Sequence, residues 1–395
     1  MHHEKMHRAS RLVGKAWIAG WIALRAGELW AGGIPMSAIA APNQLDVVVI
    51  APPGTPAGSQ LYLTGDSPEL CSWNPKCIPL QKIGIATYRA TIALGGSARE
   101  VEFKITRGSW EQEAADGRSQ PLANFKAQVP SAEPTILSLH HWSDLPPLGV
   151  TGQVEIHKDF YSPELGNSRI LSVRLPRDYG LHPDQRYPVI YMQDGQNVFD
   201  PARSTLGVDW GIDEALPLAG VPDPIVVAID CNDQDRTAEY TWSQKGALYS
   251  KFVTDTVKPF IDRTYRSRPD RDHTFVMGSS FGAMISFSML WKRPDVFSAA
   301  AGLSFPTQGP GQSREAFKII AETPPPSLPV RFYMDHGTGG LDGSYAGPAI
   351  EFADKLRAYG WREPFFQFPV YPFQQHSEAD WAARAEIPLR FLLGG

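Results

Sequence analysis

Residues 274–290 read TFVMGSSFGAMISFSML and carry the strongest structural signal in the chain. Its first part, Thr274–Met277, is β-branched and aromatic, which is typical of a strand, and its last part, Ala283–Leu290, favours a helix. The pentapeptide GSSFG at 278–282 joins them directly. A side chain at either glycine would collide with the neighbouring strand or helix where the backbone bends this sharply. The pattern predicts a strand, a tight turn and a helix, with the hydroxyl of Ser280 raised clear of a sheet.

This turn suits nucleophilic chemistry. Ser280 would lie at a helix N-terminus, where free backbone N–H groups, that of Phe281 first, can hold a developing oxyanion. One such donor contributes roughly 3 kcal/mol in a transition state. The alternative is a Gly/Ser-rich turn that only connects two elements. The strand before it and the helix after it favour a nucleophile at Ser280.

A serine nucleophile needs a base, and the chain offers two histidines after Ser280, His336 and His376. In folds that carry a serine nucleophile on such a strand, turn and helix, the order along the chain is serine, acid, histidine. His376 lies between an expected edge strand at Phe365–Tyr371 and a final helix, where a loop-borne base belongs. His336 would serve only if that order were broken. We therefore predict His376 as the base, the alternative being an ordinary surface histidine.

Two carboxylates compete for the role of the acid. Asp335 ends the expected strand Val330–Met334, whereas Asp342 lies farther out in the loop that follows. An aspartate at a strand end more often stabilises the turn through its own backbone. We therefore predict Asp342 as the acid that orients His376, with Asp335 as the alternative.

Beyond residue 152, apolar runs of strand length alternate with intervals of helix length. This alternation predicts an α/β fold with a doubly wound, mainly parallel sheet and helices on both faces. The runs are Ser168–Leu175, Tyr187–Gln193, Pro224–Ile229, His273–Met277 and Val330–Met334.

The part of the chain before this alternation has a different spacing of apolar residues. Short alternating stretches separated by Gly, Pro, Asn and Ser predict a small all-β, immunoglobulin-like sandwich. The stretches are Leu45–Ile50, Gln60–Thr64, Ala86–Ala93 and Arg99–Ile105. We expect a sandwich over 44–140, a proline-containing linker over 141–152 and an α/β domain over 153–395.

The composition limits the kinds of partner and cofactor that are expected. The 37 basic and 42 acidic side chains give a net charge of -5, which offers no general attraction to nucleic acid or anionic lipid. Three cysteines form neither a disulfide framework nor a zinc motif, although Cys71 and Cys77 could bridge in an oxidising compartment. No run approaches the ~20 apolar residues of a membrane span. We expect no metal and no cofactor.

Residues 1–43 are ambiguous. An apolar run, Ala16–Leu24, and an Ala-x-Ala pattern ending at Ala40 loosely resemble a secretory signal, but Arg25 interrupts it. An equally economical interpretation is that translation begins at Met36 and that the preceding residues form no fixed structure. Localisation stays open, with secretion or a periplasmic location slightly favoured over the cytoplasm.

Several separated motifs give the segment from about 152 to 393 a resemblance to the esterase D type of α/β hydrolases. This group includes enterochelin esterases, feruloyl and acetylxylan esterases and S-formylglutathione hydrolases. The motifs are YPVIYMQDGQN at 187–197, Arg236 with Glu239-Tyr240, the Ser280 turn, DHGT at 335–338, and His376 with Trp381. The resemblance implies an α/β-hydrolase fold and hydrolysis of carboxylic esters through an acyl-enzyme.

The resemblance also implies roles for individual residues. The loop after the third strand would supply a second oxyanion donor, the N–H of Gln196, unless this loop is an ordinary turn. Arg236, Glu239 and Tyr240 would border the substrate cleft, although an Arg–Glu pair is as often structural. Ala283 stands where many relatives carry glycine.

A further departure bears on the acid loop. Gly339 lies where close relatives often carry glutamate, which leaves the choice between Asp342 and Asp335 as the acid open.

Three stretches, Leu61–Asp66, Leu70–Pro75 and Glu102–Glu111, give the N-terminal part a resemblance to a starch-binding or glycogen-binding module. In sugar-binding relatives a pair of tryptophans stacks on pyranose faces, and Trp73 and Trp110 match these positions. The alternative is that Trp73 fills the sandwich core and that the module only shapes the mouth of the active site.

The function expected from the sequence is therefore hydrolysis of a carbohydrate-linked feruloyl or acetyl ester by a serine esterase. A siderophore lactone is the alternative substrate. Acyl transfer to an alcohol and non-catalytic carbohydrate binding are the alternatives of another class.

Overall fold

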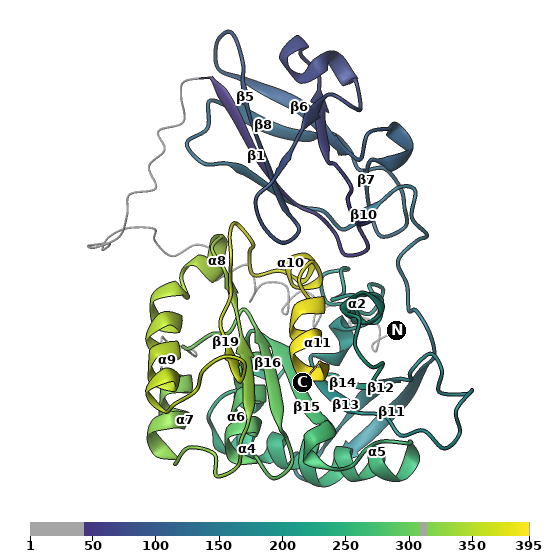
Figure 1. Cartoon of the computed structure of the whole chain (residues 1–395), viewed down its shortest axis with the longest axis vertical. Coiled ribbons are helices and arrows are strands. Elements are labelled where there is room, and N and C mark those ends of the chain that lie inside the picture. The colour runs from purple at the N-terminus through teal and green to yellow at the C-terminus, as the bar shows by residue number, and fades with distance from the viewer. Residues whose placement is uncertain (1–42, 309–313, 395) are drawn as a thin grey trace, which may run out of the picture. The chain divides into compact units, whose positions relative to one another are not determined.

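The computed structural model describes residues 43–308 and 314–394. Along the described chain, a β-sandwich is followed by an α/β domain (Figure 1). The signal-like segment expected at 1–43 lies, except for Asn43, outside the described residues. No described helix has the length and apolar character needed to cross a membrane.

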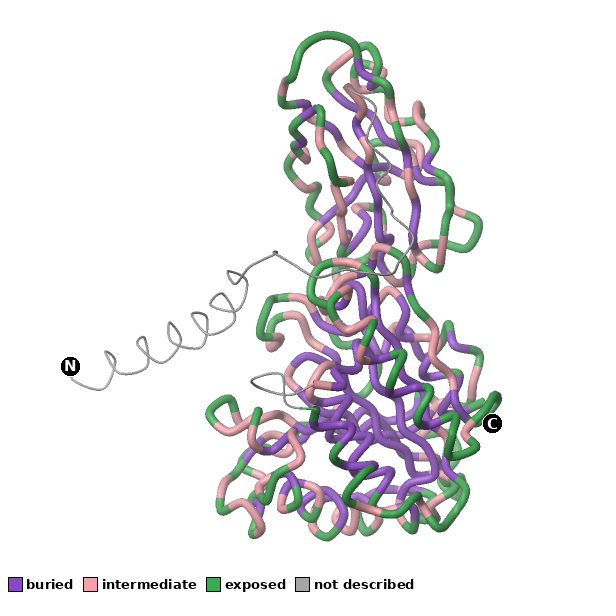
Figure 2. The backbone as a smooth tube through the Cα atoms, turned by 90° about the vertical axis from the view of Figure 1, so that its left-hand side faces the viewer, coloured by how far each residue is buried: buried purple, intermediate pink, exposed green. Residues whose placement is uncertain are grey.

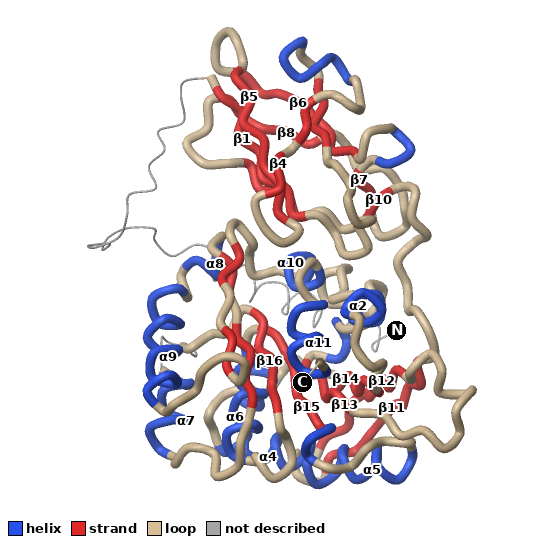
Figure 3. Tube along the Cα trace, viewed as in Figure 1, coloured by secondary structure: helices blue, strands red, loops and turns tan. Residues whose placement is uncertain are grey.

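The first part is the expected sandwich of two four-stranded sheets (Figure 3). One sheet has the order β4 (Gln81–Lys82), β5 (Thr87–Ala93), β1 (Gln44–Ile50), β9 (Thr135–Ser138). The other has the order β3 (Ile78–Pro79), β2 (Tyr62–Gly65), β6 (Arg99–Thr106), β8 (Phe125–Val129). A separate two-stranded sheet consists of β7 (Ala114–Ala115) and β10 (His141–Trp142). Alternate side chains such as Val47, Leu63 and Phe103 are buried between the sheets.

The second part is built on an eight-stranded sheet. Its order is β11 (Val154–Ser162), β12 (Asn167–Arg174), β14 (Ile225–Ile229), β13 (Val189–Gln193), β15 (Thr274–Ser279), β16 (Ala299–Leu303), β17 (Arg331–Met334), β19 (Phe366–Gln367). β11 and β12 are antiparallel to their neighbours, whereas the pairs from β14 to β19 are parallel. The predicted α/β, mainly parallel sheet is confirmed. Its parallel strands all present their carboxyl ends at one edge.

Two apolar layers cover the faces of this sheet, because successive strand residues point to opposite sides. One core packs the sheet against α4 (Gln244–Lys251), α5 (Lys258–Thr264), α6 (Phe281–Lys292), α7 (Glu315–Glu322) and α9 (Ala346–Ala358). The other packs it against α2 (Ile212–Ala219) and α11 (Glu386–Leu393). Figure 2 shows the buried strands as a continuous purple layer between these helices. Helices thus cover both faces of the sheet. A binding site is therefore expected at the carboxyl ends of the parallel strands.

Two strands of the eight-stranded sheet were not predicted from the sequence. β16 reads AAAGL and lacks the β-branched residues that mark strands, yet it is fully buried at the centre of the sheet. Its small residues are required, because a Cβ at Gly302 would lie 2.8 Å from the Cβ of Ala283 in α6. β11 is an edge strand with mixed exposure and a bulge. The strand expected at Phe365–Tyr371 is present as two pieces, β19 and β20 (Val370–Tyr371).

Candidate active site

Ser280 occupies the turn between β15 and α6. Its backbone has φ 52°, in the left-handed region that a non-glycine residue rarely adopts. A Cβ at Gly278 would lie 2.6 Å from the carbonyl carbon of Gly282, and a Cβ at Gly282 would lie 3.0 Å from the Cβ of Gln193. Both glycines are therefore sterically required, as the sequence predicted.

Two backbone N–H groups near this turn are available as oxyanion donors. Among the described residues, neither Phe281, the first residue of α6, nor Gln196 donates its backbone N–H to a group outside its own helix or helical turn. Gln196 lies in the single turn η3 (Gly195–Asn197) directly after β13. Its side chain is fixed by Cys231, which receives a hydrogen bond from Nε2 at its Sγ (3.2 Å) and donates its N–H to Oε1 (3.2 Å). The loop is thus held in place through a side chain rather than through this N–H.

His376 and Asp342 are brought together from two loops. His376 Nδ1 lies 2.7 Å from Asp342 Oδ1, with the histidine side chain 16% exposed and the aspartate fully buried. The loops meet because β18 (His336–Gly337) pairs in parallel with β20, and α8 (Gly340–Gly343) follows. A buried acid thus orients a partly exposed imidazole.

The competing candidates have other partners. Asp335 is fully buried and accepts two hydrogen bonds from Arg384, at 3.1 Å each. His336 is 1% exposed and its Nδ1 lies 2.6 Å from the carbonyl oxygen of Gly337. The geometry therefore favours Asp342 and His376 over this neighbouring pair.

The carboxylate of Asp342 is itself fixed. Its Oδ2 accepts hydrogen bonds from the N–H of Gly337 (2.8 Å) and from the hydroxyl of Ser304 (2.5 Å). Burial would raise the pKa of Asp342, but the hydrogen bond to His376, the charge of Arg384 and the Ser304 hydroxyl together lower it below its usual value. Asp342 is thus held ionised at neutral pH.

Three neighbouring parallel strands end in strained residues. Asp194, Ser280 and Ser304 directly follow β13, β15 and β16, with φ of 55°, 52° and 46°. None is glycine, and each such conformation costs on the order of 1–3 kcal/mol. The strain is concentrated at the carboxyl edge, where the candidate nucleophile lies.

The three residues expected to border the substrate cleft divide into two groups. Arg236 is partly exposed, and its side chain forms a bidentate ion pair with Asp194 (2.6 and 2.8 Å). Glu239 and Tyr240 are fully buried. Glu239 pairs with buried Arg169, and the Tyr240 hydroxyl accepts the Asp194 N–H (3.2 Å), so the polar groups of both residues are bonded inside the protein; their place beside the cleft stays a prediction.

The two departures from the family pattern have steric explanations. Ala283 is accommodated because Gly302, opposite it in β16, has no side chain. A Cβ at Gly339 would lie 2.7 Å from the carbonyl oxygen of Phe373, so the acid loop packs too closely for glutamate there. Neither departure disturbs the contact between Asp342 and His376.

The candidate sugar-binding tryptophans lie in short helical turns of the sandwich. Trp73 ends η1 (Pro68–Trp73) and is partly exposed, and Trp110 begins η2 (Trp110–Gln112) and is 37% exposed. The sandwich core is filled by Trp142, not by Trp73. A hydrogen bond from Thr106 Oγ1 to the carbonyl oxygen of Pro75 (2.5 Å) joins the two segments that carry them.

The same region contains the disulfide that the sequence allowed. Cys71 within η1 is bonded to Cys77, and Cys231 is free.

One group of acids among residues 43–308 and 314–394 brings ligand oxygens close enough to share a cation. The oxygens of Asp209, Asp213 and Glu214 lie within 4.8 Å of one another. Burial, reinforced by the Asp213 charge, raises the pKa of Asp209 to about 7 and that of Glu214 to about 9. The cluster therefore carries bound protons at neutral pH.

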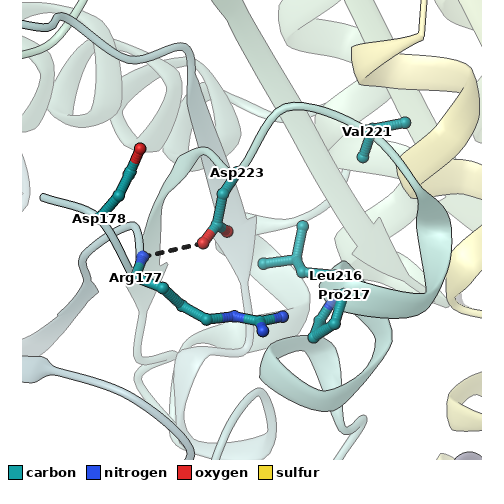
Figure 4. A pocket seen from close by; sticks show the side chains of 6 residues that line it. All are labelled: Arg177, Asp178, Leu216, Pro217, Val221 and Asp223. Atoms are coloured by element: carbon teal, nitrogen blue, oxygen red, sulfur yellow. Dashed lines mark hydrogen bonds between the residues drawn. The ribbon is translucent and has the colours of Figure 1, made fainter.

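A surface cavity of about 210 Å³ lies away from Ser280 (Figure 4). It is lined by Leu216 and Pro217 of α2 and by Asp223, which accepts a hydrogen bond from the Arg177 N–H (2.9 Å). Asp223 precedes β14, so the cavity is at the amino edge of the parallel strands. It is not part of the candidate active site.

The sequence analysis missed the residues that support the acid. Ser304 follows β16, which was not predicted, so no pattern in the sequence indicated that Ser304 lies near Asp342. Arg384 lies in an apolar C-terminal stretch and is fully buried, where it contacts Asp335, Ser304 and Gln374. An arginine flanked on both sides by alanine was the available signal.

A doubly wound, mainly parallel sheet with a serine turn after a central strand defines an α/β hydrolase. Comparison with known families agrees. The sequence model of the family described as "Putative esterase" matches residues 162–384, more than half of the chain, and the chain belongs to this family. The model described as "Starch binding domain" matches residues 44–137.

Individual relatives are distant. An endo-1,4-beta-xylanase/feruloyl esterase of Xylanibacter ruminicola is 24% identical over 163 residues, 40% of this chain and 22% of that protein. The chain thus spans about a fifth of the length of this curated relative. Among solved structures, ferric enterobactin esterase from Salmonella typhimurium is 15% identical, with 88% of this chain and 93% of that chain covered and a TM-score of 0.49. A ferulic acid esterase from Anaeromyces mucronatus is 15% identical, with 60% and 90% covered and a TM-score of 0.44.

Proposed function

We propose that this protein is a serine carboxylic-ester hydrolase that works through an acyl-enzyme on Ser280. The proposal rests on the hydrogen bond between His376 and the buried carboxylate of Asp342. These residues lie in loops at the same edge of the sheet as Ser280, which directly follows β15. Membership in the esterase family supports the same reaction.

The first half-reaction uses each group in a distinct role. Asp342 keeps the proton of His376 on Nδ1, so that Nε2 is free to take the proton of Ser280. The Ser280 oxygen attacks the ester carbonyl, and the N–H groups of Phe281 and Gln196 hold the resulting oxyanion. His376 then returns the proton to the departing alcohol, which leaves the acyl group on Ser280.

The second half-reaction repeats these steps with water. His376 takes a proton from water, which attacks the acyl carbonyl and releases the acid and free Ser280. Arg236 lies beside this path but is neutralised by Asp194, so we assign it to the shape of the cleft rather than to charge recognition.

For the substrate we propose an ester linked to a carbohydrate, such as a feruloyl or acetyl group. The match of residues 44–137 to a starch-binding domain and the feruloyl esterase name of one relative support this class. We propose that the sandwich, 44–140, binds polysaccharide through Trp73 and Trp110, and that 153–395 is the catalytic domain. A siderophore ester remains the alternative substrate of the same chemistry.

The first test is hydrolysis of p-nitrophenyl acetate and butyrate by the wild type and by Ser280→Ala, with thermal melting of both. Activity that disappears in a folded variant supports the proposal. A folded wild type that is inactive on these esters, on feruloylated and acetylated oligosaccharides and on a siderophore triester contradicts it. Product analysis with an added alcohol acceptor distinguishes hydrolysis from acyl transfer.

Polysaccharide binding is tested separately by affinity electrophoresis in starch gels. Trp110→Ala is expected to lose retardation, because an exposed indole supplies stacking area worth about 1 kcal/mol or more. Trp142→Phe, in the sandwich core, serves as the control for folding. Migration of the wild type that starch does not alter would refute starch binding.

A further inference from the structure

Ser304 has no role in the reaction described above, yet it is a fully buried polar residue in a strained conformation beside Asp342. We propose that Ser304, fixed by Trp381 and Arg384, is a positioning residue that sets the orientation of the Asp342 carboxylate and thereby of His376. The proposal rests on the proposed function, since it concerns the acid of that reaction.

The hydrogen bonds around Ser304 have only one possible direction. Its Oγ lies 2.7 Å from Trp381 Nε1, 3.0 Å from Arg384 Nη2 and 2.5 Å from Asp342 Oδ2. An indole N–H and a guanidinium can only donate, so they occupy the two acceptor sites of the hydroxyl. The single hydroxyl proton must then point to Asp342. The hydroxyl therefore serves as a fixed donor and not as a rotating group.

The backbone of Ser304 is fixed as well. Its N–H donates to Asp335 Oδ1 (2.7 Å), and Arg384 holds that carboxylate from the other side. The residue before it, Leu303, accepts the Ser280 N–H through its carbonyl oxygen (3.0 Å). Ser304 is thus one residue away from the strand contact that places the nucleophile.

Trp381 links this cluster to the base. Its ring packs edge-on against the ring of His376, with centroids 5.0 Å apart, while its N–H is directed at Ser304. The indole therefore contacts both the imidazole and the residue that fixes the acid. Any rotation of the Asp342 carboxylate would break a hydrogen bond to Ser304, Gly337 or His376.

The test compares Ser304→Ala, Trp381→Phe and the double variant in kcat and KM for p-nitrophenyl acetate. Loss of a hydrogen bond to a charged group is expected to lower kcat of Ser304→Ala about 30-fold, with KM within about twofold. Trp381→Phe is expected to lower kcat about 10-fold. Because phenylalanine keeps an aromatic ring beside His376 and loses only the N–H that acts through the Ser304 hydroxyl, the double variant should match Ser304→Ala and not fall about 300-fold.

The pH profile separates positioning from a general loss of structure. Without the Ser304 donor the pKa of Asp342 rises, so the acid limb of kcat/KM moves to higher pH. Ser172→Ala is the matched control: this serine is also fully buried and accepts a hydrogen bond from an arginine, Arg203 (2.7 Å). It should lose similar stability and keep the profile.

Labelling of Ser280 by a fluorophosphonate gives a second readout that needs no ester substrate. A wild type that neither hydrolyses esters nor labels overturns the proposed function, and the role of Ser304 with it. An active wild type whose Ser304→Ala variant keeps kcat, labelling rate and acid limb overturns the positioning role alone. Multiplicative loss in the double variant also overturns it, because Trp381 would then act independently.

Discussion

Replacing Asp342 by asparagine should impose the wrong tautomer on His376. Oδ2 of Asp342 faces two donors, of which the N–H of Gly337 can only donate. The oxygen of an asparagine must therefore occupy this side, and its NH₂ group must face His376 Nδ1. Nδ1 then accepts, the ring proton moves to Nε2, and Nε2 can no longer take the proton of Ser280.

The expected loss is about 10⁴-fold in kcat, which corresponds to about 5.5 kcal/mol, as for the same change in other serine triads. The assay is p-nitrophenyl acetate hydrolysis, with ¹⁵N chemical shifts of histidine-labelled protein to identify the tautomer of His376. Asp223→Asn, at the opposite edge of the sheet, is the control and should keep kcat. An Asp342→Asn enzyme with kcat within tenfold of the wild type would refute the assignment of Asp342 as the orienting acid.

Two further predictions concern stability. Arg384→Met leaves the buried carboxylate of Asp335 without its partner, which costs about 3–5 kcal/mol, so calorimetry should show Tm lower by about 10 °C; an unchanged Tm would contradict this. Glu214 has a folded pKa raised to about 9, mainly by burial, so its contribution to stability is complete below the unfolded pKa and is lost as pH rises toward 9. Glu214→Gln should therefore match the wild type at pH 4 and melt about 5 °C higher at pH 9, whereas a lower Tm at pH 9 would show that the carboxylate is stabilised there.

Much of this architecture is predictable because it depends on local patterns. The turn at 278–282 contains its own steric requirement, and the runs that became β12, β13, β14 and β15 are apolar enough to be recognised. The preference for Asp342 over Asp335 also followed from local reasoning, since a residue at a strand end is held by the strand's neighbours. Such features need no knowledge of distant contacts.

The missed features depend on contacts between distant segments. β16 is a strand only because Gly302 must pass close to α6, and Arg384 is buried only because Asp335 lies opposite it, 49 residues earlier in the chain. The ion pair of Glu239 depends on a distant contact in the same way. Its partner, Arg169, is 70 residues away and gives no signal in the sequence around 236–240.

The left-handed residues at the ends of β13, β15 and β16 imply a conflict between thermostability and turnover. Glycine at Asp194, Ser280 or Ser304 would relieve backbone strain, but at Asp194 it would also break an ion pair and at Ser304 buried hydrogen bonds, so selection for heat resistance alone would accept the change most readily at Ser280. Each such change removes a side chain from the candidate active site. A programme of directed evolution should therefore keep these three positions fixed and seek stability elsewhere, for example at the exposed apolar residues Leu181 and Leu206.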